Sequence, residues 1–208
     1  MVILTCSKVV TIDGPSRSGK SEYLRNVIPI VERENISLRY VEDMIRSAPG
    51  EDEVERNFWI LSMISQIFIE EKQRLIIIER GPWSCMASIM AHAVIEGSKG
   101  RKRKQYIEDA IVLARSLLNR VNLFVFVDVS LEVALERDKE AGASQPGRII
   151  NLKFFPILKQ CYQDTRQQIP AYKIRSINGE DERSKNQSKL FSMLVKLVTN
   201  NNKGNPGM

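Results

Sequence analysis

Short runs of apolar residues alternate with longer segments of helical periodicity along the whole chain. Most of the short runs are rich in β-branched residues and have the length of strands buried on both faces of a sheet. The longer segments place apolar residues three and four positions apart, as amphipathic helices do. The predicted strands are residues 9–12, 36–41, 75–78, 123–127 and 172–177. The predicted helices are a first one that ends near residue 34, then 53–72, 84–95, 106–118, a helix capped by Ser130, 151–168 and 183–199.

Because strands and helices alternate, we predict an α/β fold in which helices cover both faces of a five-stranded parallel sheet. One domain is expected to span residues 1–199. Residues 139–150 lose the periodicity and gain glycine and proline, which predicts a mobile lid segment. The polar tail, residues 200–208, is predicted to be disordered. In such sheets ligands bind at the carboxyl ends of the strands, so the residues that end each strand are site candidates.

The loop after the first predicted strand matches the phosphate-loop pattern G-x-x-x-x-G-K-[ST] at every fixed position. A predicted helix follows it, which completes the context that this motif requires. Glycine lets the backbone approach an anion closely, and the helix N-terminus adds partial positive charge. We therefore predict a P-loop NTPase fold that binds ATP and Mg²⁺. The predicted nucleotide-binding residues are Gly14, Pro15, Ser16, Arg17, Ser18, Gly19, Lys20 and Ser21.

Four of the candidate side chains have specific predicted roles in phosphoryl transfer. Lys20 is expected to reach the β- and γ-phosphates, and Ser21 to place its hydroxyl on Mg²⁺. Glu79 and Arg80 close the third predicted strand. A carboxylate there can hold Mg²⁺ directly or through water, and the arginine can clamp a phosphate or the attacking oxygen of an acceptor.

Three further arginines are candidates at the edges of this site. Arg17 lies inside the phosphate loop, where it either stabilises the transferring phosphoryl group or is an exposed loop residue. Arg148 ends the predicted lid, and closing the lid over ATP would bring its charge to the triphosphate. Arg137 is expected to cap the end of its helix instead.

Charge and composition add few constraints on the function. The 208 residues carry a net charge of +6, which suits a polyanionic substrate such as a nucleotide and also nucleic acid. Residues 97–104 are predicted to form a basic loop. Because this loop has no interleaved aromatic residues on which bases could stack, we favour a solvated surface loop over a nucleic-acid site. The single histidine, His92, excludes a histidine triad and is expected to serve packing.

The cysteines and the N-terminus bear on the compartment. The three cysteines are far apart and have no metal-binding spacing, which is typical of reduced thiols. The chain shows neither the layout of a signal peptide nor an apolar run of membrane-spanning length. We predict a cytoplasmic protein that does not bind membranes, and the sequence leaves a homodimer open.

Three blocks of the sequence resemble the thymidylate kinase family and the related deoxynucleoside kinases. Residues 14–21 resemble the form of the phosphate loop that carries an arginine before its last glycine, and Arg17 falls on that arginine. Residues 79–87 are similar to the family's acidic-Arg-Tyr-x-x-Ser-x-x-Ala signature, and residues 123–137 to its strand-to-helix segment. The resemblance implies that Arg17, Lys20 and Ser21 serve ATP, that Glu79 and Arg80 face the acceptor, and that Arg148 belongs to the lid.

The sequence departs from this family on the acceptor side. The loop carboxylate of thymidylate kinases is replaced by Ser16, and Ser88-Ile89 stands where their Tyr-Gln pair is expected. Their Arg-Glu-Pro motif is missing, and the carboxylate Glu42 stands there, as in deoxynucleoside kinases. Two acceptors therefore stay open: a nucleoside monophosphate held by Arg80, or a nucleoside whose 5′-hydroxyl is deprotonated by Glu42. A protein that binds nucleotide without turnover is the third hypothesis.

Overall fold

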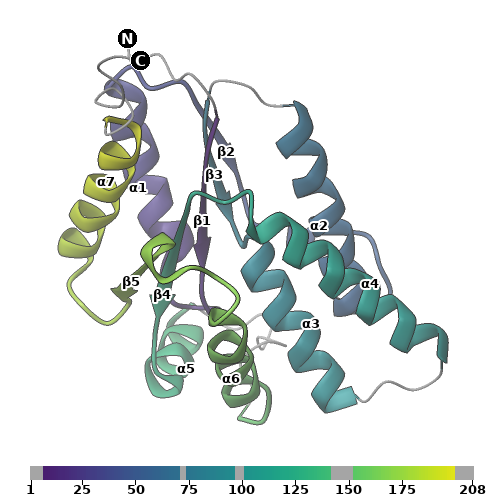
Figure 1. The fold of residues 1–208 in the computed structure, drawn as a ribbon. Coiled ribbons are helices and arrows are strands. Elements are labelled where there is room, and N and C mark those ends of the chain that lie inside the picture. The colour runs from purple at the N-terminus through teal and green to yellow at the C-terminus, as the bar shows by residue number, and fades with distance from the viewer. Residues whose placement is uncertain (1–6, 71–73, 97–100, 142–151, 200–208) are drawn as a thin grey trace.

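A parallel β-sheet forms the centre of the molecule. The computed structural model describes residues 7–70, 74–96, 101–141 and 152–199. Within these ranges the strands are β1 (Lys8–Asp13), β2 (Leu38–Val41), β3 (Leu75–Glu79), β4 (Leu123–Asp128) and β5 (Ile174–Asn178). They lie in the order β2-β3-β1-β4-β5, and every pairing is parallel (Figure 1). The predicted five-stranded parallel sheet is confirmed.

Helices cover the sheet on both faces, as predicted. The described helices are α1 (Lys20–Arg33), α2 (Glu53–Glu70), α3 (Pro82–Glu96), α4 (Arg101–Leu118), α5 (Leu131–Glu140), α6 (Phe154–Arg166) and α7 (Arg183–Thr199), with 3-10 turns η1 (Met44–Arg46) and η2 (Ala171–Lys173). Helices α1 and α7 lie side by side on one face, and α2, α3, α4 and α6 cover the other (Figure 1).

The side-chain alternation of the strands explains the two layers. Leu75 and Ile77 of β3 pack into the core with α1 and α7, whereas Ile76 and Ile78 pack into the core with α2 and α3. All four side chains are at most 1% exposed. A strand that is apolar at consecutive positions can bury both faces, and this is why β3 occupies an interior position of the sheet.

The register of the sheet places polar residues together at one edge. Ile12 of β1 lies opposite Glu79 of β3, so that Asp13 and Arg80 follow directly beyond this pair. The backbone N–H of Arg80 donates to the Ile12 carbonyl at 3.1 Å and continues the ladder past the end of β3. Strand β1 thus ends between β3 and β4, at the point where the chain connections diverge and where ligands bind in open parallel sheets.

Several predicted boundaries are wrong. Residues 101–104 were expected in a basic loop but form the first turn of α4, because lysine and arginine favour helices without adding apolar periodicity. Helix α5 continues through Glu140, so the lid cannot begin at residue 139. Helix α6 begins at Phe154 rather than at residue 151, and Tyr172 lies in η2 rather than in β5. The remaining lid residues 142–150, with Arg148, and the tail 200–208 lie outside the described residues.

Candidate active site

The phosphate loop joins the end of β1 to the start of α1. Its two glycines adopt backbone angles that other residues rarely take, with φ of 135° at Gly14 and 100° at Gly19. A Cβ atom on Gly14 would lie 2.2 Å from the Val127 carbonyl oxygen of β4. Gly14 is therefore needed both for its conformation and for the close packing of the loop against the neighbouring strand.

The Lys20 side chain folds back inside this loop. Its ammonium group donates to the carbonyl oxygens of Gly14 at 3.0 Å and Pro15 at 2.7 Å, and to Ser18 Oγ at 3.2 Å. Only 7% of Lys20 is exposed. Burial, reinforced by the nearby charge of Arg80, lowers the pKa of Lys20 from 10.5 to about 8. The lysine is held at the centre of the loop, where an anion bound by the loop would meet it.

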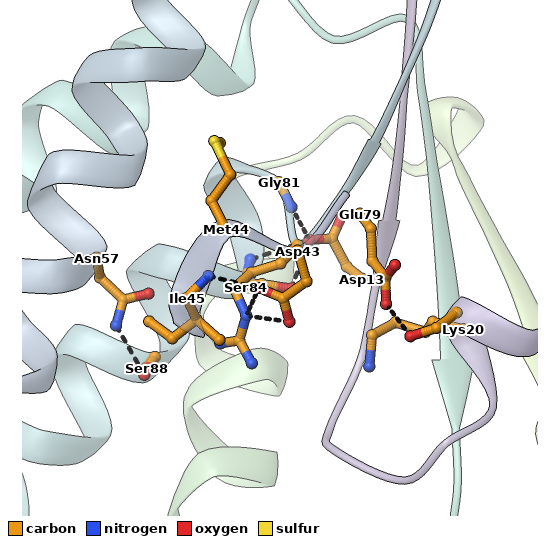
Figure 2. A network of polar contacts seen from close by, with 12 residues as sticks. Asp13, Lys20, Asp43, Met44, Ile45, Asn57, Glu79, Gly81, Ser84 and Ser88 are labelled. Atoms are coloured by element: carbon orange, nitrogen blue, oxygen red, sulfur yellow. Dashed lines mark hydrogen bonds and ion pairs between the residues drawn. The ribbon is translucent and has the colours of Figure 1, made fainter. Parts of the chain in front are cut away.

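The structure brings together the two residues predicted to bind a metal. Ser21 Oγ donates to Glu79 Oε1 at 2.5 Å, across 58 positions of the chain. The Tyr40 hydroxyl donates to Glu79 Oε2 at 2.9 Å and fixes the other oxygen of the same carboxylate. Figure 2 shows Glu79 lying next to Lys20. One hydroxyl and one carboxylate are hard oxygen donors of the kind that Mg²⁺ uses together with substrate phosphates and water, so these residues fit the ion.

Arg80 forms an ion pair with Asp43 at the end of β2. Its Nε donates to both carboxylate oxygens of Asp43, at 3.0 and 3.1 Å. Burial alone would lower the pKa of Arg80, but the charge of Asp43 raises it above the ordinary value, so the guanidinium stays charged. Arg80 has a φ of 63°, an uncommon conformation for a residue with a side chain. Asp43 also accepts from the Ile45 N–H, which fixes its orientation.

Sequence reasoning considered both residues that follow this strand and gave the role of base to Glu42 rather than to Asp43. Glu42 is exposed in the structure, whereas Asp43 contacts Arg80. Both residues end β2 at the same edge of the sheet, and only the direction of the side chains distinguishes them. In the described part of the chain the terminal nitrogens of Arg80 donate no hydrogen bond, so they are available to a ligand.

A buried polar network lies beneath the phosphate loop and the Arg80 turn. Asp13 is fully buried and accepts from Thr11 Oγ1 at 2.5 Å, from the Gly81 N–H at 3.1 Å, and from the Ser84 N–H and hydroxyl at 3.1 and 2.6 Å. The Tyr162 hydroxyl of α6 lies 2.9 Å from Ser84 Oγ and 3.2 Å from the Gly14 carbonyl oxygen. Burial raises the pKa of Asp13, and the four hydrogen bonds oppose this shift. Sequence reasoning missed this network, since its members come from three separate segments.

Helix α5 braces the outer side of the phosphate loop. Arg137 donates to the Arg17 carbonyl at 3.1 Å and to the Gly179 carbonyl at 2.7 Å, so the prediction that it caps its own helix is wrong. Arg17 is paired with Asp138, with its Nε 2.8 Å from Oδ1. The predicted N-cap is confirmed, because Ser130 Oγ accepts from the Val133 N–H.

A small pocket of about 10 Å³, about the room that one water molecule needs, lies beside the phosphate loop. The loop residues Gly14, Pro15 and Ser16 form one wall, and helices α2, α3 and α6 form the others. The remaining lining residues are Glu53, Arg80, Ser88, His92, Phe154, Leu158 and Tyr162. His92 was expected to serve packing; its ring contacts Phe154 with centroids 4.7 Å apart, and its Nδ1 lies 2.9 Å from Glu96.

The fold is shared with solved kinase structures. The chain superposes on a thymidylate kinase from Candida albicans with a TM-score of 0.64 at 17% identity, covering 92% of each chain. It also matches two structures of deoxyadenosine kinase from M. mycoides, each at 14% identity. The TM-score is 0.66 for the structure of that enzyme with dCMP and dCDP, and 0.68 for the structure with dCTP. These two alignments cover 91% and 90% of this chain and 99% of that enzyme. The chain has the P-loop kinase fold.

This likeness concerns the architecture, and the predicted kinase resemblance is confirmed at that level. No protein-family profile matches the chain, and no curated protein does. Among the described residues no three or more acidic, histidine or cysteine side chains group as a metal site, so the Ser21–Glu79 pair would need ligands from substrate and water. None of the described helices has the length and apolar character to cross a membrane.

Proposed function

We propose that the protein transfers the γ-phosphoryl group of ATP to a nucleoside monophosphate or a nucleoside. The observation that supports this proposal is the adjacency of two half-sites. Lys20 and the Ser21–Glu79 pair lie at the phosphate loop, and Arg80 follows Glu79 directly and lines the pocket beside the same loop. A donor phosphate and an acceptor oxygen could therefore meet at the ends of β1 and β3.

On the donor side the chain's own groups bind and orient ATP. The loop N–H groups and the N-terminus of α1 bind the phosphates, and Lys20 turns from its carbonyl contacts to the β- and γ-oxygens. Ser21 and Glu79 would hold Mg²⁺, and the ion would supply positive charge against the phosphate oxygens. Without ATP, Arg17 Nε lies 2.8 Å from Asp138 Oδ1. When ATP binds, Arg17 leaves Asp138 and places its positive charge near the γ-phosphate.

A nucleoside monophosphate is the first acceptor candidate. The terminal nitrogens of Arg80 form a planar fork that matches a phosphate, while Nε stays on Asp43 and holds the fork in place. The acceptor phosphate would then lie next to the loop residues that bind ATP.

The Arg80–Asp43 pair also favours the second candidate, a nucleoside. A carboxylate fixed at hydrogen-bonding distance from an arginine can accept the proton of a 5′-hydroxyl while the guanidinium orients the oxygen. In this case Asp43, rather than the exposed Glu42, is the better placed base. Asp43 therefore has a different role with each acceptor: it orients Arg80 for a monophosphate, and it accepts the hydroxyl proton of a nucleoside.

A panel of nucleosides and nucleoside monophosphates, scored for ADP release, tests the proposal. Turnover of monophosphates that survives Asp43→Asn supports the first candidate. Turnover of nucleosides that falls at least about a hundredfold in Asp43→Asn, and little in Glu42→Gln, supports the second. Lys20→Ala should abolish turnover in both cases. ATP binding without transfer to any member would contradict the proposal and favour a nucleotide-binding protein without turnover.

A further inference from the structure

Two adjacent residues of helix α5 hold Arg17 of the phosphate loop, one by its backbone and one by its side chain. Arg137 donates to the Arg17 carbonyl at 3.1 Å, and Asp138 accepts from Arg17 Nε at 2.8 Å. Arg17 has a φ of 62°, which residues with a side chain rarely adopt. Arg137 is itself anchored by a second bond, to the Gly179 carbonyl at 2.7 Å, and so fixes this backbone. The Arg17 side chain can therefore change partners while the loop keeps its shape.

Asp138 places a negative charge beside a loop whose motif binds phosphate. Its side chain is 13% exposed and that of Arg17 is 36% exposed, so water screens the pair only in part. A carboxylate in this position repels a bound anion. The ion pair with Arg17 offsets that repulsion for as long as the arginine stays on the carboxylate. An anion that draws Arg17 away must therefore replace an existing attraction.

The number of phosphates on the nucleotide decides whether Arg17 gains by leaving Asp138. A phosphate loop binds the β-phosphate through backbone N–H groups, and Lys20 supplies a cation there. A diphosphate therefore occupies the loop without Arg17, which keeps its carboxylate partner. A triphosphate adds a γ-phosphate, whose oxygens match a guanidinium group as a carboxylate does. Only the triphosphate thus competes with Asp138 for the arginine.

We propose that Asp138 is a positioning residue that competes with the γ-phosphate for Arg17, and so sets how strongly the site prefers a nucleoside triphosphate to a diphosphate. This inference rests on the proposed function, since it takes the loop to hold ATP before transfer and ADP after it. Once the γ-phosphoryl group has left, Arg17 returns to Asp138 and the diphosphate is held without the arginine. If Asp138 merely tied α5 to the loop, its loss would alter the binding of both nucleotides alike.

The experiment measures the binding of ADP and of an ATP analogue with a β,γ-imido bridge, by calorimetry with Mg²⁺ present. In Asp138→Asn the analogue should bind about three- to fivefold more tightly than in the parent, because the competing ion pair is lost, and ADP affinity should change by less than about twofold. Arg17→Gln should weaken analogue binding about tenfold and leave ADP binding unchanged. In the Arg17→Gln background, Asp138→Asn should no longer change the ratio of the two affinities.

Glu136→Gln is the matched control, because it removes the same charge from an exposed position of the same helix. It should leave the ratio of the two affinities unchanged. That ratio is taken within each variant, so a loss of stability that affects both nucleotides alike cancels.

Three results would overturn the inference. These are an equal gain for ADP and the analogue in Asp138→Asn, an analogue affinity that stays constant or falls, and a ratio that Asp138→Asn changes equally with and without Arg17. Phosphoryl transfer is measured separately. A parent protein that shows the expected pattern but transfers phosphate to no acceptor contradicts the proposed function and keeps the inference. If neither nucleotide binds, both fail.

Discussion

The Ser84 hydroxyl donates a 2.6 Å hydrogen bond to Oδ1 of Asp13, and both side chains are at most 1% exposed. Asp13 directly precedes the phosphate loop, and Ser84 lies in the first turn after the Arg80 turn. The bond therefore joins the backbone that leads into the phosphate loop to the backbone that positions Arg80. The distance between the two half-sites is set beneath the pocket, by groups that need not touch either substrate.

Replacing Asp13 by asparagine should destabilise the protein and misalign the two half-sites. The neutral amide retains the shape but removes the carboxylate that accepts all four hydrogen bonds, and its NH₂ group reverses the bond with the Thr11 hydroxyl, which then accepts. The expected loss is about 2 kcal/mol in the free energy of unfolding, because hydrogen bonds to a charged group contribute more than neutral ones. Urea denaturation measures it. Asp164→Asn on the exposed side of α6 is the control, and a variant of Asp13 as stable as that control would contradict the network's role.

Affinity for ATP should fall as the pH rises above about 8. The pKa of free Lys20 is lowered to about 8, so above that pH the free protein must take up a proton to present a cation to the phosphates. Linkage then predicts a loss of about tenfold per pH unit until the pKa of the bound state is reached. Calorimetry between about pH 7 and about pH 9.5 tests this dependence.

The lowered pKa of Lys20 affects the stability of the fold in the opposite direction to its effect on ATP affinity. Between about pH 8 and pH 10.5 the unfolded chain keeps the Lys20 proton that the folded protein has lost, so the Lys20 contribution to the free energy of unfolding rises with pH in this range.

The control for the pH dependence of ATP affinity is Lys20→Met. This variant cannot titrate at residue 20, and it should bind ATP weakly with a flat pH profile. A parent profile that is equally flat would show that Lys20 does not titrate in this range.

Tyr40→Phe should weaken the response to Mg²⁺. The variant removes only the hydroxyl that donates to Glu79 Oε2 at 2.9 Å, and leaves Ser21 on Oε1. Groups that orient a metal ligand typically contribute about tenfold or more to metal affinity. The midpoint of Mg²⁺-dependent ATP binding, followed by thermal shift, should move upward by about that factor. Tyr172→Phe, at a residue 74% exposed, should leave the midpoint unchanged.

Arg137→Lys should loosen the phosphate loop although it preserves the charge. The guanidinium reaches the carbonyls of Arg17 and Gly179 with two separate nitrogens, and a single ammonium group cannot reproduce that fork. We expect ATP affinity to fall about fivefold, the equivalent of one lost hydrogen bond. Glu136→Gln, exposed on the same helix, is the control. Unchanged affinity in Arg137→Lys would mean that other contacts fix the loop.

The sequence predicts the parts of this molecule that local chemistry determines. The strand–loop–helix context of residues 14–21, the cap at Ser130 and the last helix, Arg183–Thr199, all follow from periodicity and capping, and the structure reproduces them. The start of α4 at Arg101 could not be predicted from periodicity or capping. Its first turn lacks apolar residues and favours a helix only through side-chain propensity.

The site residues divide in the same way. Glu79 and Ser21 could be selected because each stands at a fixed point next to a strand or a loop. Asp43, Tyr162 and Arg137 could not, since their roles depend on which way a side chain turns and on contacts across 37 to 148 positions of the chain. Pairings of that kind are set by tertiary packing, which no local pattern contains.

The register between β1 and β3 limits how this chain can vary. Ile12 faces Glu79, so one residue inserted into either strand would turn its apolar side chains to the wrong layer and carry Glu79 away from Ser21. The interior of those strands tolerates exchange among valine, isoleucine and leucine more readily than any change of length. Lengthening should therefore be confined to the surface connections, because the register of β1 and β3 sets the position of Arg80 relative to the phosphate loop.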